Sequence, residues 1–167
     1  GPAAADIAAI TTGFIESFKA EWALQGGRGP LRRVAIVDDT PQAQYLYPEF
    51  VLFKRLFETH GIAAVIAAPQ DLHLQDGQLW HGGDKIDLVY NRLTDFDLSD
   101  DTHRVLSEAY RSNACVITPN PWSYAHLADK RNLIVLSDSE KLADIGAAPS
   151  AIETLRLAVP KTVALGA

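Results

Sequence analysis

The apolar and polar positions of this chain follow two periods, one typical of helices and one typical of buried strands. Residues 4–24 carry apolar side chains at steps of three and four, which predicts one amphipathic helix. After the glycine-rich residues 26–30, short runs that are apolar throughout alternate with helical segments, as in parallel sheets covered on both faces. We expect core strands at residues 34–37, 62–67, 87–90 and 115–117, and a last strand at residues 159–165.

Helices are expected between and after these strands. Pro48 suits the first turn of a helix that follows the first strand. Asp76-Gly77 lies between two alternating segments and predicts a hairpin inserted after the second strand. The last helix is expected to be capped by Ser150. Further helices are expected at residues 100–112, 122–136, 139–145 and 150–157.

Strands that alternate with helices predict a Rossmann-like, doubly wound α/β fold, with a mainly parallel sheet, the inserted β-hairpin and an extra N-terminal helix. We divide the chain into an N-terminal helix and linker (1–30), an α/β domain (31–126) and a helical segment (127–167). The chain of 167 residues contains no Met and opens with Gly1-Pro2. This opening indicates an excised piece of a larger protein, and proteolytic maturation is the alternative.

Composition and motifs narrow the classes of function. The net charge is −6 and no stripe of Lys or Arg is visible, which argues against nucleic-acid binding. No GxGxxG follows the first strand and no Walker motif occurs, which argues against a dinucleotide enzyme. The chain has no apolar run of about 18 residues and no signal peptide, so we expect a cytoplasmic protein without membrane contact. The single cysteine, Cys115, lies in an apolar run and is expected to be buried and unreactive.

Polar residues that follow the predicted strands are the candidates for ligand contact, because open parallel sheets bind ligands beyond the carboxyl ends of their strands. Asn91 and Arg92 follow the third strand. A guanidinium at this place can hold a carboxylate or a phosphate through two hydrogen bonds. The alternative for Arg92 is an ion pair with Asp95 or Asp97 that holds the loop.

Asp38 and Asp39 follow the first strand, and Asn120 follows the fourth. The two carboxylates could hold a metal or an amine, but adjacent residues alternate faces, and one of them is better suited to cap a turn. His73 and His81 flank the hairpin turn and could face each other across it. Two imidazoles without a third ligand make a weak metal site, and a surface pair is the alternative that we favour.

Four segments together resemble the front region of a group of bacterial ATP-grasp proteins, which are distantly similar to glutathione and glutathionylspermidine synthetases. They are residues 45–50 (YLYPEF), 88–96 (LVYNRLTDF), 119–121 (PNP) and 128–133 (ADKRNL). The similarity runs over residues 33–162. The resemblance implies a Rossmann-like pre-ATP-grasp domain that helps to bind the substrate of a ligase. Such ligases join a carboxylate to an amine or a thiol, using ATP and Mg²⁺.

The resemblance also assigns a role to Lys130, since a lysine shortly after this domain often contacts the nucleotide phosphates. The alternative for Lys130 is a surface lysine paired with Asp129 or Asp138. After Thr162 the family carries a lysine-bearing strand, a glycine-rich loop and metal carboxylates, and this chain carries none of them. We therefore expect ATP and Mg²⁺ to bind in a full-length protein with the missing C-terminal ATP-grasp lobes, and expect no cofactor and no catalytic activity in this chain.

The function expected from the sequence is therefore the substrate-side domain of an ATP-dependent ligase. Asp38, Asn91, Arg92 and Asn120 would line the side of a small carboxylate or amine substrate. One alternative is a non-catalytic Rossmann-like module that binds a small anion or a partner protein. Another is a structural piece whose last segment pairs with the missing lobes, or with a second copy in a homodimer.

Overall fold

The computed structural model of the chain describes residues 4–164, with side chains from residue 7 onward. The chain divides into two compact units, Gly1–Pro121 and Trp122–Ala167. The sequence places the corresponding boundary after residue 126. Within the described residues, none of the helices is both long enough and apolar enough to cross a membrane.

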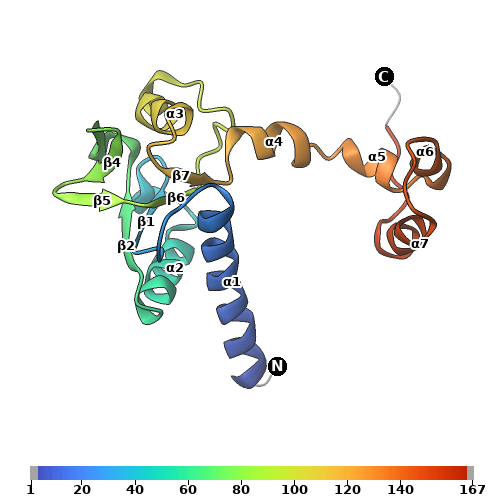
Figure 1. The fold of residues 1–167 in the computed structure, drawn as a ribbon, viewed down its shortest axis with the longest axis horizontal. Coiled ribbons are helices and arrows are strands. Elements are labelled where there is room, and N and C mark those ends of the chain that lie inside the picture. The colour runs from blue at the N-terminus through green and yellow to red at the C-terminus, as the bar shows by residue number, and fades with distance from the viewer. Residues whose placement is uncertain (1–3, 165–167) are drawn as a thin grey trace. The chain divides into compact units, whose positions relative to one another are not determined.

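A four-stranded parallel sheet forms the centre of the first unit, in the order β2-β1-β6-β7 (Figure 1). Its strands are β1 (Arg33–Val37), β2 (Ala63–Ala67), β6 (Leu88–Asn91) and β7 (Val116–Thr118). Helix α2 (Tyr47–Thr59) connects β1 to β2, and α3 (Arg104–Arg111) connects β6 to β7. The four predicted core strands are confirmed to within a residue or two at their ends, and so is the doubly wound α/β fold.

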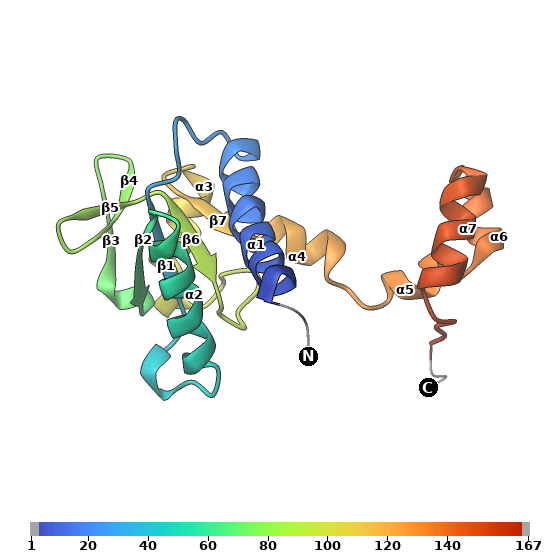
Figure 2. The same cartoon turned by 90° about the horizontal axis from the view of Figure 1, so that it is seen from below.

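Successive side chains of the central strands enter two different apolar layers, as the pleat of a strand requires. Val34 and Ile36 pack in a layer with α2 and with α1 (Ala4–Leu24), which lie beside each other in Figures 1 and 2. The ring of Phe18 on α1 lies 5.0 Å from the rings of both Phe57 and Tyr90. The predicted N-terminal helix is confirmed, and its inner face is part of the core of this unit.

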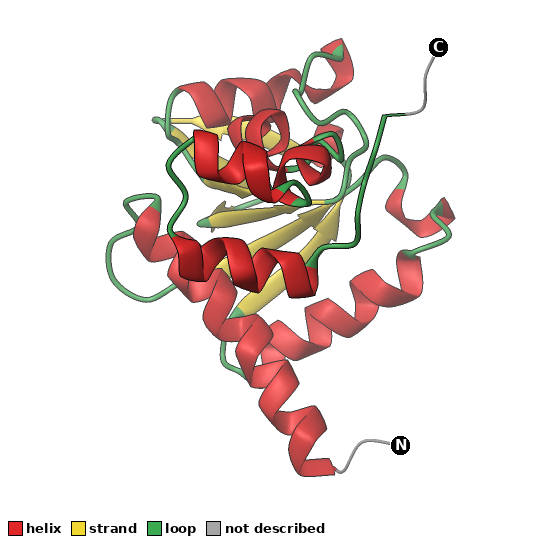
Figure 3. Cartoon of the chain, turned by 90° about the vertical axis from the view of Figure 1, so that its right-hand side faces the viewer, coloured by secondary structure: helices red, strands yellow, loops and turns green. Residues whose placement is uncertain are grey.

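The opposite face of the sheet is covered by α3 and by a small antiparallel sheet in the order β3-β4-β5. Figure 3 colours the strands yellow and the helices red. Its strands are β3 (Leu72–Gln75), β4 (Gln78–His81) and β5 (Asp84–Ile86). The predicted hairpin around Asp76-Gly77 is confirmed and extended by β5. The sequence did not predict β5, because only Ile86 of its three residues is buried.

His73 and His81, considered from the sequence as residues that could face each other across this hairpin, do not do so. The register pairs His73 with Trp80 and His81 with Leu72. Partners in an antiparallel pair share a face and neighbours along a strand alternate, so the two imidazoles lie on opposite faces.

The second unit is helical. Its helices are α4 (Pro121–Leu127, which starts at the last residue of the first unit), α5 (Asn132–Leu136), α6 (Ser139–Asp144) and α7 (Pro149–Ala158). The single helix predicted over residues 122–136 is interrupted between α4 and α5. Helix α7 begins at Pro149, whose ring suits the first turn, and the residue before it is Ala148. Ser150 is therefore inside the helix, and its predicted capping role was wrong.

The predicted last strand is absent from the described part of its range, residues 159–164. Position 165 lies outside the described residues. The backbone N–H of Thr162 donates to Oγ of Ser137 at 3.0 Å, and Nζ of Lys161 lies 3.7 Å from a carboxylate oxygen of Asp138. This segment is thus held by side chains at the junction of α5 and α6, without a strand partner.

Candidate functional site

The order of the parallel strands reverses between β1 and β6. From β1 the chain crosses to β2 through α2, and from β6 it crosses to β7 through α3, on the opposite face of the sheet. Because these connections leave in opposite directions, open α/β sheets bind ligands beyond the carboxyl ends of such a strand pair. We call this place the switch point, defined here as residues 38–40 after β1 and residues 91–103 after β6.

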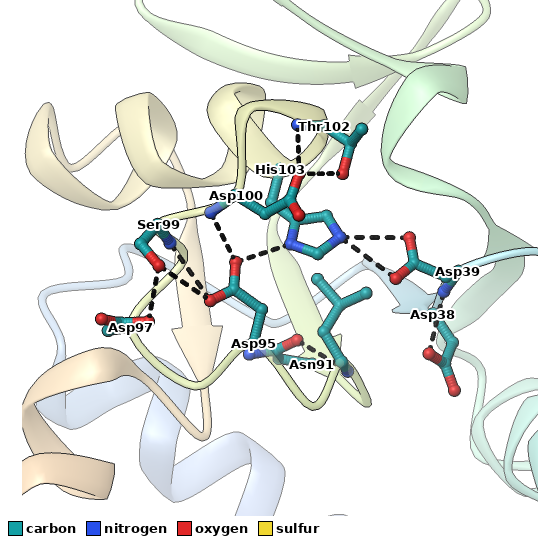
Figure 4. A network of polar contacts seen from close by, with 10 residues as sticks. Asp38, Asp39, Asn91, Asp95, Asp97, Ser99, Asp100, Thr102 and His103 are labelled. Carbon is teal, nitrogen blue, oxygen red and sulfur yellow. Dashed lines mark hydrogen bonds and ion pairs between the residues drawn. The ribbon is translucent and has the colours of Figure 1, made fainter.

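A network of polar contacts centred on His103 occupies the switch point (Figure 4). The carboxylate of Asp95 accepts four hydrogen bonds, all from its own loop. Two come from Ser99, through its backbone N–H (3.2 Å) and its hydroxyl (3.3 Å), and the others come from the backbone N–H of Asp100 (3.0 Å) and from Nδ1–H of His103 (2.7 Å). These hydrogen bonds hold both the loop and the carboxylate of Asp95 in place. The carboxylate in turn fixes the orientation of the imidazole ring of His103.

His103 joins the two segments of the switch point. It ends the 3₁₀ turn η3 (Asp101–His103) and is only 3% exposed. Its Nε2 lies 3.1 Å and 3.2 Å from the two carboxylate oxygens of Asp39, which follows β1. The imidazole thus lies between Asp39 on one side and Asp95 on the other, as Figure 4 shows.

The protonation of this network follows from its contacts. Burial lowers the pKa of His103, but the hydrogen bonds to Asp95 and Asp39 outweigh burial and raise that pKa above its ordinary value. Burial raises the pKa of Asp95, but the hydrogen bonds from His103, Asp100 and Ser99 hold it well below its usual range. The arrangement favours an imidazolium between two carboxylates.

Asp38 lies beside this network. Its Oδ1 accepts a hydrogen bond from the backbone N–H of Asp39, the next residue in the chain, at 2.8 Å. The following turn η1 (Pro41–Ala43) has Thr40 as its N-terminal boundary and no side-chain capping bond, so Asp38 does not have the capping role expected for one of the two carboxylates. Burial raises the pKa of Asp38 despite the hydrogen bond from Asp39, the charge of Asp39 raises it further, and the charge of Arg92 lowers it. Asp38 is thus a half-buried carboxylate whose charge is only partly compensated.

Arg92 is held at the carboxyl end of β6 by partners from two elements. Its Nη2 lies 3.1 Å from Oε1 of Glu49 on α2, and its Nη1 donates to the hydroxyl of Tyr90 at 3.0 Å. The guanidinium also lies over the rings of Tyr90 and Phe50. Within residues 7–164, the buried Nε of Arg92 has no hydrogen-bond partner.

The loop-holding ion pair considered for Arg92 in the sequence is not formed. Asp95 bonds to His103, and Oδ1 of Asp97 accepts from the hydroxyl of Ser99. Glu49 takes the place of both as the partner of Arg92. Helix α2 carries Glu49 to this strand end, and its position depends on packing that the local sequence does not encode.

Asn91 and Asn120 complete the group predicted to line the substrate side. Asn91 is 1% exposed; its Oδ1 accepts from the backbone N–H of Leu93 at 3.1 Å, and its Nδ2 donates to the carbonyl of Pro119 at 3.4 Å. Asn120 follows β7 and is half-buried. Asn91 therefore braces the ends of β6 and β7, and Arg92 is the better placed of the adjacent pair to meet a ligand.

Lys130 belongs to the second unit, between α4 and α5, and is exposed. Its considered partners are engaged elsewhere: Asp129 bonds to Arg131, and Asp138 lies near Lys141 and Lys161. Within the described residues Lys130 forms no ion pair.

Sequence reasoning missed His103 as a member of the site, since it stood among five scattered histidines. The signal was its context: residues 95–103 follow a core strand and carry four aspartates before the histidine. The rule that ligands bind beyond the carboxyl ends of parallel strands (the strand-end rule) selected Asp39 and the loop after Arg92, which are the two ends of the network. It did not select His103, which joins them.

Cys115 and the possible metal ligands add no further chemistry at this place. Cys115 is buried in the core, and burial raises the pKa of its thiol far above the ordinary range, so the expected inert thiol is confirmed. In the part of the chain that the structure describes, no three His, Cys, Asp or Glu residues gather in a way that could hold a metal ion.

Comparison with models of known protein families and with curated proteins found no match.

Proposed function

We propose that the first unit binds a small charged substrate at the switch point, as the substrate-side domain of an ATP-dependent ligase of the ATP-grasp type. The observation that carries this proposal is Arg92, a guanidinium held at the carboxyl end of β6 where the strand order reverses. Support for the ligase class comes from the four sequence segments that resemble ATP-grasp proteins.

Arg92 suits a carboxylate ligand because its position is fixed while its ion pair is replaceable. The rings of Tyr90 and Phe50 hold the guanidinium, so little side-chain freedom is lost on binding. Its partner Glu49 is partly exposed and comes from a different element. A ligand carboxylate can therefore take the place of Glu49 on Nη2 of Arg92.

Asp38 provides the complementary charge next to Arg92. The two side chains are near enough for the charge of Arg92 to lower the pKa of Asp38. A ligand with a carboxylate and an amine could place the first on Arg92 and the second on Asp38. This pairing matches the amino-acid-like or peptide-like substrates that carboxylate–amine ligases join.

The nucleotide side of the proposal rests on Lys130 and the resemblance around it. The exposed ammonium of Lys130, without an ion pair within residues 4–164, fits a contact with phosphate oxygens. ATP would supply the phosphoryl group that activates the carboxylate, and Mg²⁺ would need ligands from beyond these residues. The role that falls to this chain is to bind and orient the substrate.

Calorimetry tests the proposal with L-glutamate, glutathione and spermidine as substrate probes and with Mg·ATP as nucleotide. We expect Arg92→Ala to abolish binding of the carboxylate probes by this chain. In a protein extended by the ATP-grasp lobes, we expect Lys130→Ala to weaken Mg·ATP binding and to leave carboxylate binding unchanged. Arg104→Ala is the matched control, because Arg104 is an exposed arginine of the same unit whose partner is Glu108.

Three outcomes separate the proposal from its alternatives. Carboxylate binding that Arg92→Ala leaves intact would contradict the site. Carboxylate binding together with no Mg·ATP binding, even in a protein that includes ATP-grasp lobes, would leave the non-catalytic anion-binding module. Lys130→Ala without effect on Mg·ATP binding would remove the nucleotide role of this residue.

A further inference from the structure

His103 makes a contact on each side of its ring, and the two contacts come from different parts of the chain. Nδ1 reaches Asp95 at 2.7 Å, and Nε2 reaches Asp39 at 3.1 Å. We propose that His103, held as an imidazolium between Asp39 and Asp95, is a pH-sensitive clamp that joins the segment after β1 to the segment after β6. The clamp requires neither a bound ligand nor a ligase activity.

The number of protons on the imidazole ring determines how many carboxylates it can donate to. A neutral imidazole has one N–H group and one lone pair, so it can donate to only one of the two carboxylates. The other ring nitrogen would then turn its lone pair toward a carboxylate oxygen. An imidazolium donates to both, with charge assistance. Both nitrogens lie within hydrogen-bond distance of carboxylate oxygens, so the contacts themselves select the charged form.

The charged groups around the ring are mostly acidic, from each segment that packs against it. Asp38 and Asp39 come from the segment after β1, and Asp95 and Asp100 come from the loop after β6. On the neighbouring turn η2 (Pro69–Asp71), Asp71 accepts a hydrogen bond from the backbone N–H of Ala68. The cations near the site are already engaged: Arg92 with Glu49, and Arg104 with Glu108.

The two sides of the clamp differ in strength, which decides where it opens. Asp95 is 16% exposed, has the shorter contact and is held by backbone N–H groups of its own loop. Asp39 is 55% exposed and shares Nε2–H between two oxygens at longer distances. When the imidazolium loses its proton, Nδ1–H stays on Asp95, and Nε2 no longer has a proton for Asp39. The segment after β1 is then released.

Both segments contain a residue in an unfavourable backbone conformation. Thr40 has φ 43° and Leu98 has φ 54°, in the left-handed region that β-branched and bulky residues avoid. Such conformations persist only where surrounding contacts impose them. Asp39, directly before Thr40, is bound by the clamp, so release of Asp39 removes a contact that holds Thr40 in place. We therefore expect deprotonation of His103 to change the backbone at Thr40.

Nuclear magnetic resonance of the folded chain tests the clamp through the imidazole nitrogens of His103 and the amide of Thr40 as functions of pH. We expect both nitrogens to carry protons at pH 7, and the midpoint of titration to lie above the ordinary value of about 6.5. The amide of Thr40 should shift with the same midpoint.

Two variants make the test specific without risking the fold. Asp39→Asn alters an exposed side chain, and its amide can donate to a neutral Nε2, so the midpoint of His103 should fall by about 1 pH unit. Asp84→Asn is the matched control, because Asp84 lies in the same unit, is 56% exposed and pairs with Arg33. In this control variant, the titration midpoint of His103 should equal that in the unmodified chain.

Three results would overturn the clamp. A neutral His103 at pH 7 would show that the charged form is not selected. An unchanged midpoint in Asp39→Asn would show that Asp39 does not hold the proton. An amide of Thr40 that ignores the titration of His103 would show that the segment after β1 is not released.

Discussion

Nε2 of His103 lies 3.1 Å from Oδ1 of Asp39, although 64 positions separate the two residues in the chain. The sheet order explains this contact. Because β1 and β6 are neighbours, the segments that follow them emerge side by side, and each contributes one side of the contact. At the switch point, the segment after β1 and the segment after β6 are therefore joined by a contact between charged side chains.

The first prediction concerns stability at alkaline pH. His103 has a folded-state pKa above its unfolded value, so its contribution to the free energy of unfolding is complete below about pH 6.5 and falls as pH rises through the folded-state pKa. The loss should not exceed about 1.4 kcal/mol per pH unit for this one group. Urea unfolding between about pH 6 and pH 9.5, followed by tryptophan fluorescence, measures it.

Comparing the unfolding free energy of Asp39→Asn with that of the unmodified chain separates the contribution of His103 from those of the other histidines. The variant should lose stability at pH 6 and differ less from the unmodified chain at alkaline pH, where the clamp is already open. Parallel curves for the two proteins would contradict the prediction. The carboxylate of Asp95 acts in the opposite direction: its contribution is present above about pH 3.9 and is lost as pH falls through its lowered pKa.

The second prediction concerns the competition between Glu49 and a ligand for Arg92. Glu49→Gln removes the negative charge that a ligand carboxylate has to displace, while the amide oxygen can still accept a hydrogen bond. We expect the affinity for L-glutamate to rise roughly two- to five-fold, since exposed ion pairs contribute about 0.5–1 kcal/mol. Glu58→Gln on the same helix makes the same charge change at the Lys54 pair. Equal effects of the two variants in calorimetry would show that Glu49 does not compete.

The third prediction concerns backbone strain at Thr40. Thr40 has φ 43°, which glycine adopts without steric cost. Relief of about 1–2 kcal/mol of strain is offset by the greater freedom of glycine in the unfolded chain. We expect Thr40→Gly to raise the free energy of unfolding by up to about 1 kcal/mol. Thr12→Gly, inside α1, should instead lower it by about 0.3–0.5 kcal/mol, and similar losses in both variants would argue against strain.

The fourth prediction concerns the docking of α1 on the sheet. Phe18 is buried and makes edge-to-face contacts with Phe57 and Tyr90. Phe18→Ala should lower the free energy of unfolding by about 3–5 kcal/mol. Leu24→Ala, at the end of the same helix where Leu24 is 83% exposed, should change it by no more than about 0.5 kcal/mol. A small effect of Phe18→Ala would mean that α1 does not contribute to the core of this unit.

The parallel sheet could be predicted because its strands are short runs of apolar residues without the alternation of an exposed strand. Residues 34–37 and 62–67 are such runs, and they correspond to β1 and β2. The strand predicted at residues 159–165 does not form in its described part, residues 159–164, where Thr162 bonds to Ser137 instead. β5 was missed because a short strand with one buried residue leaves no pattern to detect.

The sequence predicts where the candidate site lies, but it does not predict which residues contact each other there. The strand-end rule selects Asp38, Asn91 and Arg92, and the structure puts all three at the carboxyl ends of β1 and β6. The partners Glu49 and His103 could not be chosen from the sequence. Their contacts depend on which strands are neighbours and on how α2 lies against the sheet, and neither is encoded in the local pattern.

Chemical-shift mapping with L-glutamate and inorganic phosphate as probes tests most directly whether the switch point is a ligand site. The account predicts that the largest amide shifts fall on residues 38–40 and 91–95, together with the side chain of Arg92, and that Arg92→Ala removes them. Shifts confined to α1, or to the β3-β4-β5 sheet, would contradict it and would place ligand binding elsewhere on this unit.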